Sequence, residues 1–369
     1  MDDPRAYWVG WNLVKGVGAV RFRALLAAFG DAQTAWQAAP EDLRAAGLYE
    51  KQVANLVKVR SQGLMEKHWA QIQTNGIQVL TWDDETYPRR LKEIDQPPPV
   101  LYLRGALLPE DEWAVAIVGT RRVTAYGRSV TEELAAILAR NGVTVISGLA
   151  RGVDSIAHQA ALNAGGRTMA VMGTGVDQIY PPENQRLAEK MLEQGALLSD
   201  YPLGTQPEGT NFPPRNRLIS GLSLAVAVIE AGQTSGALIT ATFAAEQGRE
   251  VFAVPGNITA PQSQGTNRLI QDGATPLLNP QQVLEALNLT MVTEHRAARR
   301  ALPSDPVEKQ VYQVLSAEPL HVDEIRLRTE MPIEQVSATL ALMELKGMVR
   351  QVGGMNYVAV REQPLDYTV

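Results

Sequence analysis

The segment Ala114-Val-Ala-Ile-Val-Gly-Thr-Arg121 sets five consecutive apolar residues before a glycine, a threonine and an arginine. A short apolar run bounded by glycine is typical of a strand that is buried on both faces. Similar runs recur at residues 143–147, 168–172, 197–199, 224–229 and 251–254. Amphipathic segments lie between most of them, near residues 127–140, 153–164, 184–194, 237–247 and 264–272. This alternation predicts an α/β fold over residues 113–285, an extended Rossmann-like, doubly wound parallel sheet.

The flanking regions carry different patterns. Residues 1–80 are predicted to be helical, with a Gly16-Val-Gly18 turn between two apolar-periodic segments. The turn resembles a helix-hairpin-helix whose amides hold a DNA phosphate, but we favour a small helical bundle in which the glycines only allow close packing. Residues 81–112 contain Pro97-Pro-Pro99 and are predicted to form a linker and an edge strand.

The C-terminal part is predicted to form a linker over residues 286–306 and a winged helix over residues 307–369. Helices are predicted at 307–315, 322–328 and 333–346, and a hairpin wing at 347–350 and 357–359 around Gly353-Gly354. Residues 303–369 hold 6 Lys and Arg against 10 Asp and Glu, a formal charge of −4. A surface that binds phosphates should be basic, so this segment is predicted to contact protein or to regulate, and not to read duplex DNA.

Composition bounds the possible functions. The 369 residues carry a formal net charge of −6, so any nucleic-acid site must be a local patch. Cysteine is absent, which excludes disulfides and thiolate metal sites and fits a reducing, cytoplasmic location. The N-terminus lacks the basic-then-apolar pattern of a signal peptide, and no apolar run is long enough to predict a membrane span.

Small residues and arginines gather where the predicted strands end. Glycine lets the backbone approach a ligand closely, and the amides at the start of the next helix attract anions. Parallel strands bring all these ends to one rim, where a linear polyanion explains their spread better than one compact cofactor would. No G-x-G-x-x-G spacing is present, so no cofactor is expected. The strand-end residues are Gly119, Thr120, Arg121, Ser147, Gly148, Arg151, Gly173, Gly175, Ser235, Gly236 and Pro255-Gly256.

The segment Phe212-Pro-Pro-Arg-Asn-Arg217 precedes the fifth strand. Two arginines follow a double proline, which predicts a stiff loop presenting two guanidinium groups to phosphates. Asp154 and His158 lie four residues apart on a predicted helix, so they could form an acid–base pair. We favour the simpler interpretation, an aspartate near a helix start and a hydrogen-bonded histidine.

In this order, the motifs 116–121, 147–154 with Ala157-His158, Gly173-Thr-Gly175 with Tyr180-Pro181, 212–217, Ser235-Gly236 and Pro255-Gly256 resemble the DNA-processing protein A (DprA/Smf) family. The resemblance covers about 113–275 most specifically. It implies a SAM-like helical domain, an extended Rossmann fold and a winged helix. It also implies a non-enzymatic role: binding and protecting incoming single-stranded DNA in natural transformation, loading the RecA recombinase, and homodimerising through the Rossmann domain.

The resemblance implies that DNA phosphates or bases contact Arg121, Arg215 and Arg217. Asn216 lies between the last two. The turns at the other strand ends would form the walls of the site. The dimer contact is assigned to Leu269 and Ile270. The chain departs from the family in having Pro182 where a lysine often follows Tyr-Pro, which would remove a phosphate contact, and Asp200 where glutamate is commoner.

Two other functions compete with this one. A nucleotide hydrolase of the phosphoribohydrolase type would carry Pro-Gly-Gly-x-Gly-Thr-x-x-Glu, but the nearest segment, 230–240, lacks the later glutamate. A winged-helix transcription regulator that senses a nucleotide is disfavoured by the acidic C-terminal segment.

Overall fold

The computed structural model describes residues 3–289, 305–316, 319–345 and 348–359. The chain divides into two compact units, Met1–Leu289 and Thr290–Val369, and each is described by itself. The helical N-terminal segment and the sheet share the first unit, so a domain boundary near residue 80 stays a prediction. Most of the predicted linker 286–306 lies outside the described residues.

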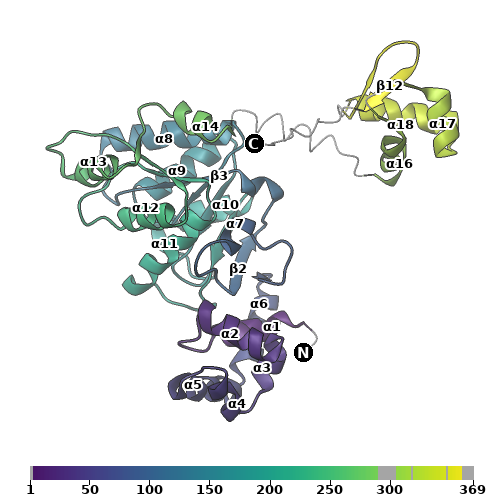
Figure 1. The fold of residues 1–369 in the computed structure, drawn as a ribbon. Coiled ribbons are helices and arrows are strands. Elements are labelled where there is room, and N and C mark those ends of the chain that lie inside the picture. The colour runs from purple at the N-terminus through teal and green to yellow at the C-terminus, as the bar shows by residue number, and fades with distance from the viewer. Residues whose placement is uncertain (1–2, 290–304, 317–318, 346–347, 360–369) are drawn as a thin grey trace. The chain divides into compact units, whose positions relative to one another are not determined.

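The first unit begins with six helices, as the sequence predicts (Figure 1). Their bounds are α1 (Arg5–Asn12), α2 (Ala19–Phe29), α3 (Ala32–Gln37), α4 (Pro40–Ala45), α5 (Glu50–Ser61) and α6 (Leu64–Thr74). Trp8, Trp11 and Phe22 lie in the core between them, with Trp8 and Phe22 ring centroids 4.8 Å apart. This core continues onto Val100 and Tyr102 of the sheet, which ties the helices to it.

The turn between α1 and α2 uses its glycines for backbone geometry. Gly16 has a φ of +94°, a conformation that residues with a Cβ rarely adopt, and its carbonyl accepts a 2.7 Å hydrogen bond from the Gln52 amide. Nothing lies within 4 Å of a Cβ placed on Gly18. The prediction that these glycines only allow close helix packing is therefore wrong: Gly16 forms the turn, and Gly18 precedes α2.

A nine-stranded sheet follows in the described residues, in the order β1-β2-β6-β5-β4-β3-β7-β8-β9. The strands are β1 (Gln78–Thr81), β2 (Val100–Gly105), β3 (Ala114–Val118), β4 (Thr144–Ser147), β5 (Thr168–Val171), β6 (Ala196–Ser199), β7 (Ala225–Val228), β8 (Glu250–Ala253) and β9 (Thr275–Pro276). From β6 to β9 all neighbouring pairs are parallel, which confirms the predicted sheet. The predicted edge strand, β2, is not at the edge, because β1 pairs antiparallel with its outer side.

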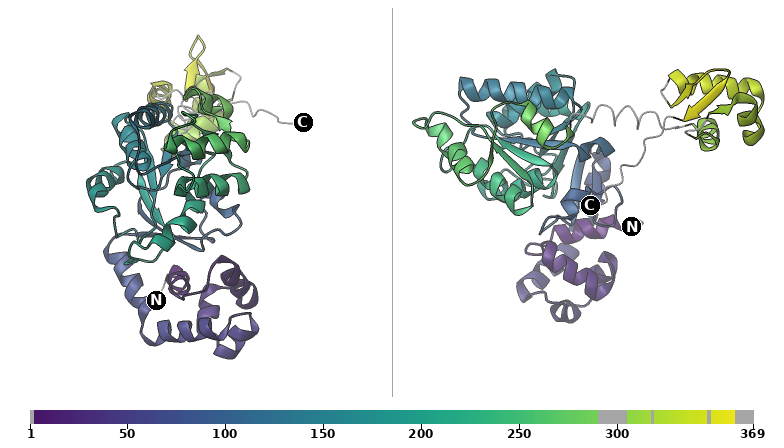
Figure 2. Two further views of the ribbon diagram at one scale, coloured as in Figure 1. Left: turned by 90° about the vertical axis from the view of Figure 1, so that its left-hand side faces the viewer. Right: turned by 45° about the horizontal axis from the view of Figure 1, so that its top comes forward.

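Helices cover both faces of this sheet, as the alternation predicts. The pair α8 (Ala125–Arg140) and α9 (Val153–Asn163) covers one face, and α11 (Phe212–Gly221) and α12 (Gly236–Glu246) cover the other (Figures 1 and 2). The remaining helices are α7 (Arg89–Lys92), α10 (Gln185–Leu192), α13 (Gln264–Gln271) and α14 (Gln281–Ala286). The chain runs outward from β3 to β6, then crosses to β7 on the other side of β3. Ligands of such sheets bind where the strand order reverses.

The segment 212–217 is not the stiff loop that the sequence predicts, because it forms the first turns of α11. Proline fits the first turn of a helix, since the amide it lacks has no helical partner there and its φ already suits the helix. Helical geometry then points Arg215 and Arg217 in different directions.

The second unit is a small winged helix, as predicted. It contains α16 (Pro306–Val314), α17 (Val322–Thr329) and α18 (Ile333–Leu345) with a three-stranded sheet of β10 (Leu320–His321), β11 (Val349–Gln351) and β12 (Asn356–Ala359). The predicted pieces at Lys346 and Gly347 lie outside the described residues. Val311, Ile325 and Leu340, one from each helix, are fully buried in its core.

Candidate nucleic-acid interface

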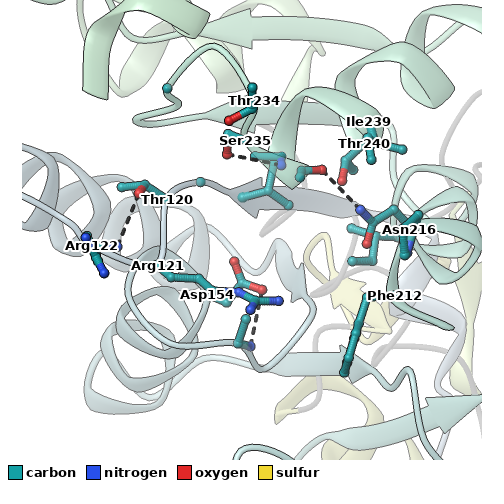
Figure 3. Close-up of a pocket in the computed structure, with 18 of the residues that line it drawn as sticks. Thr120, Arg121, Arg122, Asp154, Phe212, Asn216, Thr234, Ser235, Ile239 and Thr240 are labelled. Atoms are coloured by element: carbon teal, nitrogen blue, oxygen red, sulfur yellow. Dashed lines mark hydrogen bonds between the residues drawn. The ribbon is translucent and has the colours of Figure 1, made fainter. Parts of the chain in front are cut away.

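A pocket of about 850 Å3 opens at the carboxyl ends of the parallel strands, beside the point where the strand order reverses (Figure 3). We call it the strand-end pocket. Its lining comes from the loops after β3, β4, β5, β6, β7 and β8 and from the start of α11. The predicted residues that it brings together are Gly119, Thr120, Arg121, Arg215, Asn216, Ser235 and Gly236.

The loop after β3 is held down by Glu230, a residue that the sequence reasoning passed over. Glu230 is 3% exposed; its backbone oxygen accepts a 2.7 Å hydrogen bond from the Thr120 amide. Its carboxylate accepts hydrogen bonds from the Thr124 amide, at 2.9 Å, and from the Thr124 hydroxyl. Thr124 in turn caps α8 by accepting from the Gly127 amide. The buried carboxylate therefore fixes both ends of the loop that carries Arg121 and Arg122.

Arg121 and Arg122 are the two exposed arginines of the pocket. Neither forms an ion pair with a carboxylate in the part of the chain that the structure describes. The Arg121 guanidinium carbon lies 5.9 Å from the centre of the Phe212 ring, which also lines the pocket. The Arg121 guanidinium thus lies over the ring, as that of Arg215 does at 5.8 Å. The exposed arginine offers donors for a phosphate and, together with the ring, stacking contacts for a base.

The opposite wall is the start of α12, where Thr234 and Ser235 face the pocket (Figure 3). The Ser235 hydroxyl accepts a hydrogen bond from the Ala237 amide at 3.3 Å and so caps the helix. The Asn216 side chain donates to the Gly236 carbonyl at 3.2 Å, which joins α11 to α12. The amides of the first helical turn add positive potential to that of the arginines.

Arg215 forms part of the pocket floor, but only 4% of it is exposed. One guanidinium nitrogen donates to the Gly148 carbonyl at 3.0 Å and also to the Val171 carbonyl at the end of β5. A Cβ on Gly148 would come within 2.7 Å of the guanidinium, so glycine makes room for it. Burial lowers the pKa of Arg215 to about 10, which leaves it charged at neutral pH.

Asp154 and His158 do not hydrogen-bond to each other. The Asp154 carboxylate accepts from the Gly148 and Ala150 amides at 3.2 and 3.3 Å, and burial raises its pKa. His158 is fully buried, with its Nδ1 2.6 Å from the Thr168 hydroxyl. The simpler interpretation is confirmed, because Asp154 lies in the first turn of α9 and the buried histidine is hydrogen-bonded to Thr168.

His158 should make the protein sensitive to acid. Burial lowers its pKa from 6.5 to about 3, so between these values the unfolded chain binds a proton that the folded chain does not. The free energy of unfolding should therefore fall as pH falls through this window, by up to about 1.4 kcal/mol per pH unit from this one group. Urea unfolding of the parent and of His158→Gln from about pH 7 to about pH 4 measures the difference between them. A difference independent of pH would contradict the assignment.

Four other predicted site residues have local roles. The Ser147 hydroxyl is buried and donates to the Ile117 carbonyl at 2.6 Å. A Cβ on Gly173 would come within 2.6 Å of the Phe212 ring, so this glycine seats the ring. The Gly175 amide donates to the Thr205 carbonyl at 3.1 Å, away from the strand-end pocket. Arg151 is exposed beside the pocket and forms an ion pair with Glu183.

Arg217 turns away from the strand-end pocket. It donates to the Asp200 carboxylate at 2.6 Å, and its side chain is only 20% exposed. It lines a separate 160 Å3 cavity beside Trp8, Trp11 and the α1–α2 turn. The structure thus pairs Arg217 with the aspartate that stands where the family more often has glutamate.

Replacing Arg217 by alanine should cost stability rather than affinity. The change leaves the mostly buried Asp200 carboxylate without its cation, which we expect to lower the free energy of unfolding by about 1–3 kcal/mol. Single-stranded DNA affinity per folded molecule should stay unchanged, as measured by anisotropy beside an unfolding curve. If affinity drops while stability does not, Arg217 contacts DNA after all.

The sequence alone did not single out Arg122 or Glu230, and it marked Phe212 and Thr234 only as parts of longer motifs. A signal was available for Arg122, which directly follows a predicted contact at a strand end. Nothing in the sequence marks Glu230 as the group that holds the loop after β3, because Glu230 and its partner Thr124 are 106 positions apart.

Two searches over the described residues give negative findings. No group of three or more His, Asp or Glu side chains there is placed to hold a metal ion. None of the helices described is both long and apolar enough to cross a membrane.

Comparison with protein families matches three consecutive parts of the chain. Residues 78–288 match the family model described as DNA recombination-mediator protein A. Residues 14–61 match a DprA-like N-terminal HHH domain, and residues 295–355 match the DprA winged helix domain. The helix-hairpin-helix hypothesis for the first helices thus gains support over the plain bundle, while contact of the hairpin with DNA stays untested.

Individual relatives span most of the chain. It is 37% identical to protein Smf of Synechocystis, over 96% of this chain and 99% of that protein, and 39% identical to protein Smf of Escherichia coli, over 76% of each. The X-ray structure of DNA processing protein A from Streptococcus pneumoniae matches with a TM-score of 0.67 and 33% identity, over 77% of this chain and 98% of that one. A structure of the Helicobacter pylori protein, described for its single-stranded DNA binding mode, matches with a TM-score of 0.53 and 33% identity, over 57% and 95%.

Proposed function

The chain belongs to the DNA recombination-mediator protein A (DprA/Smf) family, and on that premise we propose that it binds single-stranded DNA in the strand-end pocket. One observation carries the proposal. Two exposed arginines, Arg121 and Arg122, have no carboxylate partner among the described residues and share a pocket with an exposed helix start and the Phe212 ring. This is a local cationic site on a chain of net charge −6, as a polyanion ligand requires.

The chemistry of the pocket suits single strands of any sequence. Arg121, Arg122 and the first amides of α12 would hold phosphates, and unpaired bases would stack on Phe212. Arg215 and Glu230 would not touch the strand; they would hold the loops that do. Gly148, Gly173 and Ser147 would act in the same indirect way, through packing and backbone contacts.

The test compares a labelled single strand with a duplex of the same length over a range of salt concentrations. We expect tight single-strand binding that weakens steeply with salt, and much weaker duplex binding. Equal affinity for the duplex would instead favour a DNA-reading winged helix. The acidic winged helix, by contrast, is proposed as a protein-contact module.

A nucleotide hydrolase remains the alternative to exclude. The pocket is lined by one carboxylate, that of Asp154. One oxygen of this carboxylate accepts hydrogen bonds from the Gly148 and Ala150 amides. His158 has no route to solvent. Incubation with nucleoside monophosphates tests the alternative, because base release with turnover would overturn the binding proposal.

The family premise extends the proposal to partners. We propose that the chain protects incoming DNA during natural transformation, loads RecA recombinase onto it, and homodimerises in the cytoplasm. We propose Leu269 and Ile270 of α13, which are half-buried, as the dimer contact. Sedimentation tests the dimer, and a monomer at all accessible concentrations would contradict it. RecA filament growth with and without the protein tests loading, and an unchanged rate would contradict it.

A further inference from the structure

A second groove, of about 600 Å3, runs between α8 and α9 on the face of the sheet opposite α11 and α12. One wall is a stripe of α8 from Arg128 to Arg140, and the other is a stripe of α9 that ends at Asn163. The start of α10, with Arg186, closes one side. We call this surface the α8–α9 groove. A 16-residue helix such as α8 is about 24 Å long, so the groove is long enough for several nucleotides.

The uncompensated charge of this groove is positive. Its two carboxylates are already paired: Glu132 lies 3.6 Å from Arg128, and Glu183 pairs with Arg151. Arg140 and Arg186 are exposed, and neither forms an ion pair within the described part of the chain. Two free guanidinium groups therefore face a groove whose acidic groups are neutralised.

The lining favours a phosphate backbone over a protein partner. The apolar side chains there, Ile156 and Leu187, are buried at 8% and 9% exposure and offer little surface to an apolar partner. The exposed charged groups are the arginines and the two ion-paired glutamates, and guanidinium groups donate hydrogen bonds to anions. A protein interface of ordinary size would need an apolar centre that this groove lacks.

The groove lies next to a small cavity beside the strand-end pocket, and one ion pair, Arg151–Glu183, joins their linings. This cavity is lined by Arg121, Phe212 and Arg151. Arg151 is ion-paired with Glu183, which lines the α8–α9 groove. The Arg151–Glu183 pair thus stands between the two surfaces, and its two charges compensate each other. Both α8 and α9 start at the pocket rim, since each follows directly from the loop after β3 or β4.

We propose that single-stranded DNA leaving the strand-end pocket passes the Arg151–Glu183 pair and continues along the α8–α9 groove, where Arg140 and Arg186 hold its phosphates. The inference rests on the proposed function, because it assigns the groove the next part of the same strand. It makes the binding site longer than the pocket, so affinity should depend on strand length.

The test uses the full chain with Arg140→Glu and Arg186→Glu combined, and two oligothymidylates of about 6 and about 20 nucleotides. We expect the affinity for the long strand to fall at least about tenfold, and its salt slope to be shallower by about 1.4, because two phosphate contacts are lost. Affinity for the short strand should be that of the parent. The matched control reverses two exposed arginines outside both surfaces, Arg44→Glu with Arg268→Glu, for the same change in net charge.

Each outcome separates the two proposals. A parent protein that binds neither strand contradicts the proposed function itself. Binding of the long strand that is unchanged, or reduced no more than by the control, overturns the groove while leaving the pocket intact. An equal loss for short and long strands also overturns it, because the groove would then not be a separate extension. Should the double reversal fail to fold, Arg140→Gln with Arg186→Gln is measured against the same expectations.

Discussion

Arg215→Met is expected to lower the free energy of unfolding by about 3–5 kcal/mol, the largest stability effect that we predict for a single substitution. The guanidinium is buried and donates to two backbone carbonyls, those of Gly148 and Val171, on neighbouring strand ends. Its removal leaves both acceptors without this donor and takes the nearby cation from the buried Asp154 carboxylate. Urea unfolding should show a lower midpoint with an unchanged dependence on denaturant.

The matched control is Arg268→Met, at an exposed arginine that pairs with Asp272 across one helical turn. Its free energy of unfolding should stay within about 0.5 kcal/mol of the parent. If Arg215→Met is as stable as this control, the guanidinium does not hold the strand ends together. The side chain would then be available to DNA, as the motif alone suggests.

Arg121→Ala combined with Arg122→Ala should weaken single-stranded DNA binding at least about 100-fold at low salt. Each exposed guanidinium is expected to contribute one charge-assisted hydrogen bond to a phosphate, and such bonds contribute about 1.5–3 kcal/mol each. Stability should not change, because neither side chain is buried or ion-paired in the described residues. Anisotropy with a short labelled strand measures the affinity, and an unfolding curve confirms that the fold is intact.

The control for this pair is Arg44→Ala with Arg268→Ala, which removes the same charge outside the pocket. It should lose little affinity, since exposed charges more than about 10 Å from the ligand are screened at ordinary ionic strength. If the pocket variant and the control lose affinity equally, binding depends on net charge alone and the site is elsewhere.

The parallel strands could be predicted because burial on both faces leaves an unbroken apolar signal, as in Ala114–Val118. Strand β1 was missed because Gln78–Thr81 follows directly on helical periodicity. Strand β1 forms the edge of the sheet, and because it pairs with β2, β2 is an inner strand. Strand β9 was missed because two residues ending in Pro276 carry no periodicity.

The sequence predicts that arginines gather at the carboxyl ends of the parallel strands. It does not predict the role of each arginine there. Arg215 and Arg217 look alike in sequence, yet one is buried in the pocket floor and the other is paired with Asp200. Only the helix that begins at Phe212 decides this, because it fixes the direction of each side chain. Arg121 differs because its loop leaves it exposed beside the Phe212 ring. Exposure and pairing depend on contacts from distant parts of the chain, which a motif does not contain.

The central claim is that Arg121 and Arg122 neutralise phosphates of a single strand in the strand-end pocket. The most direct measurement is the slope of log affinity against log salt for a short single strand, compared between the parent and Arg121→Ala with Arg122→Ala. Losing two phosphate contacts should make the slope shallower by about 1.4. Two parallel lines would contradict the claim, because they would show that neither arginine displaces counterions from the DNA.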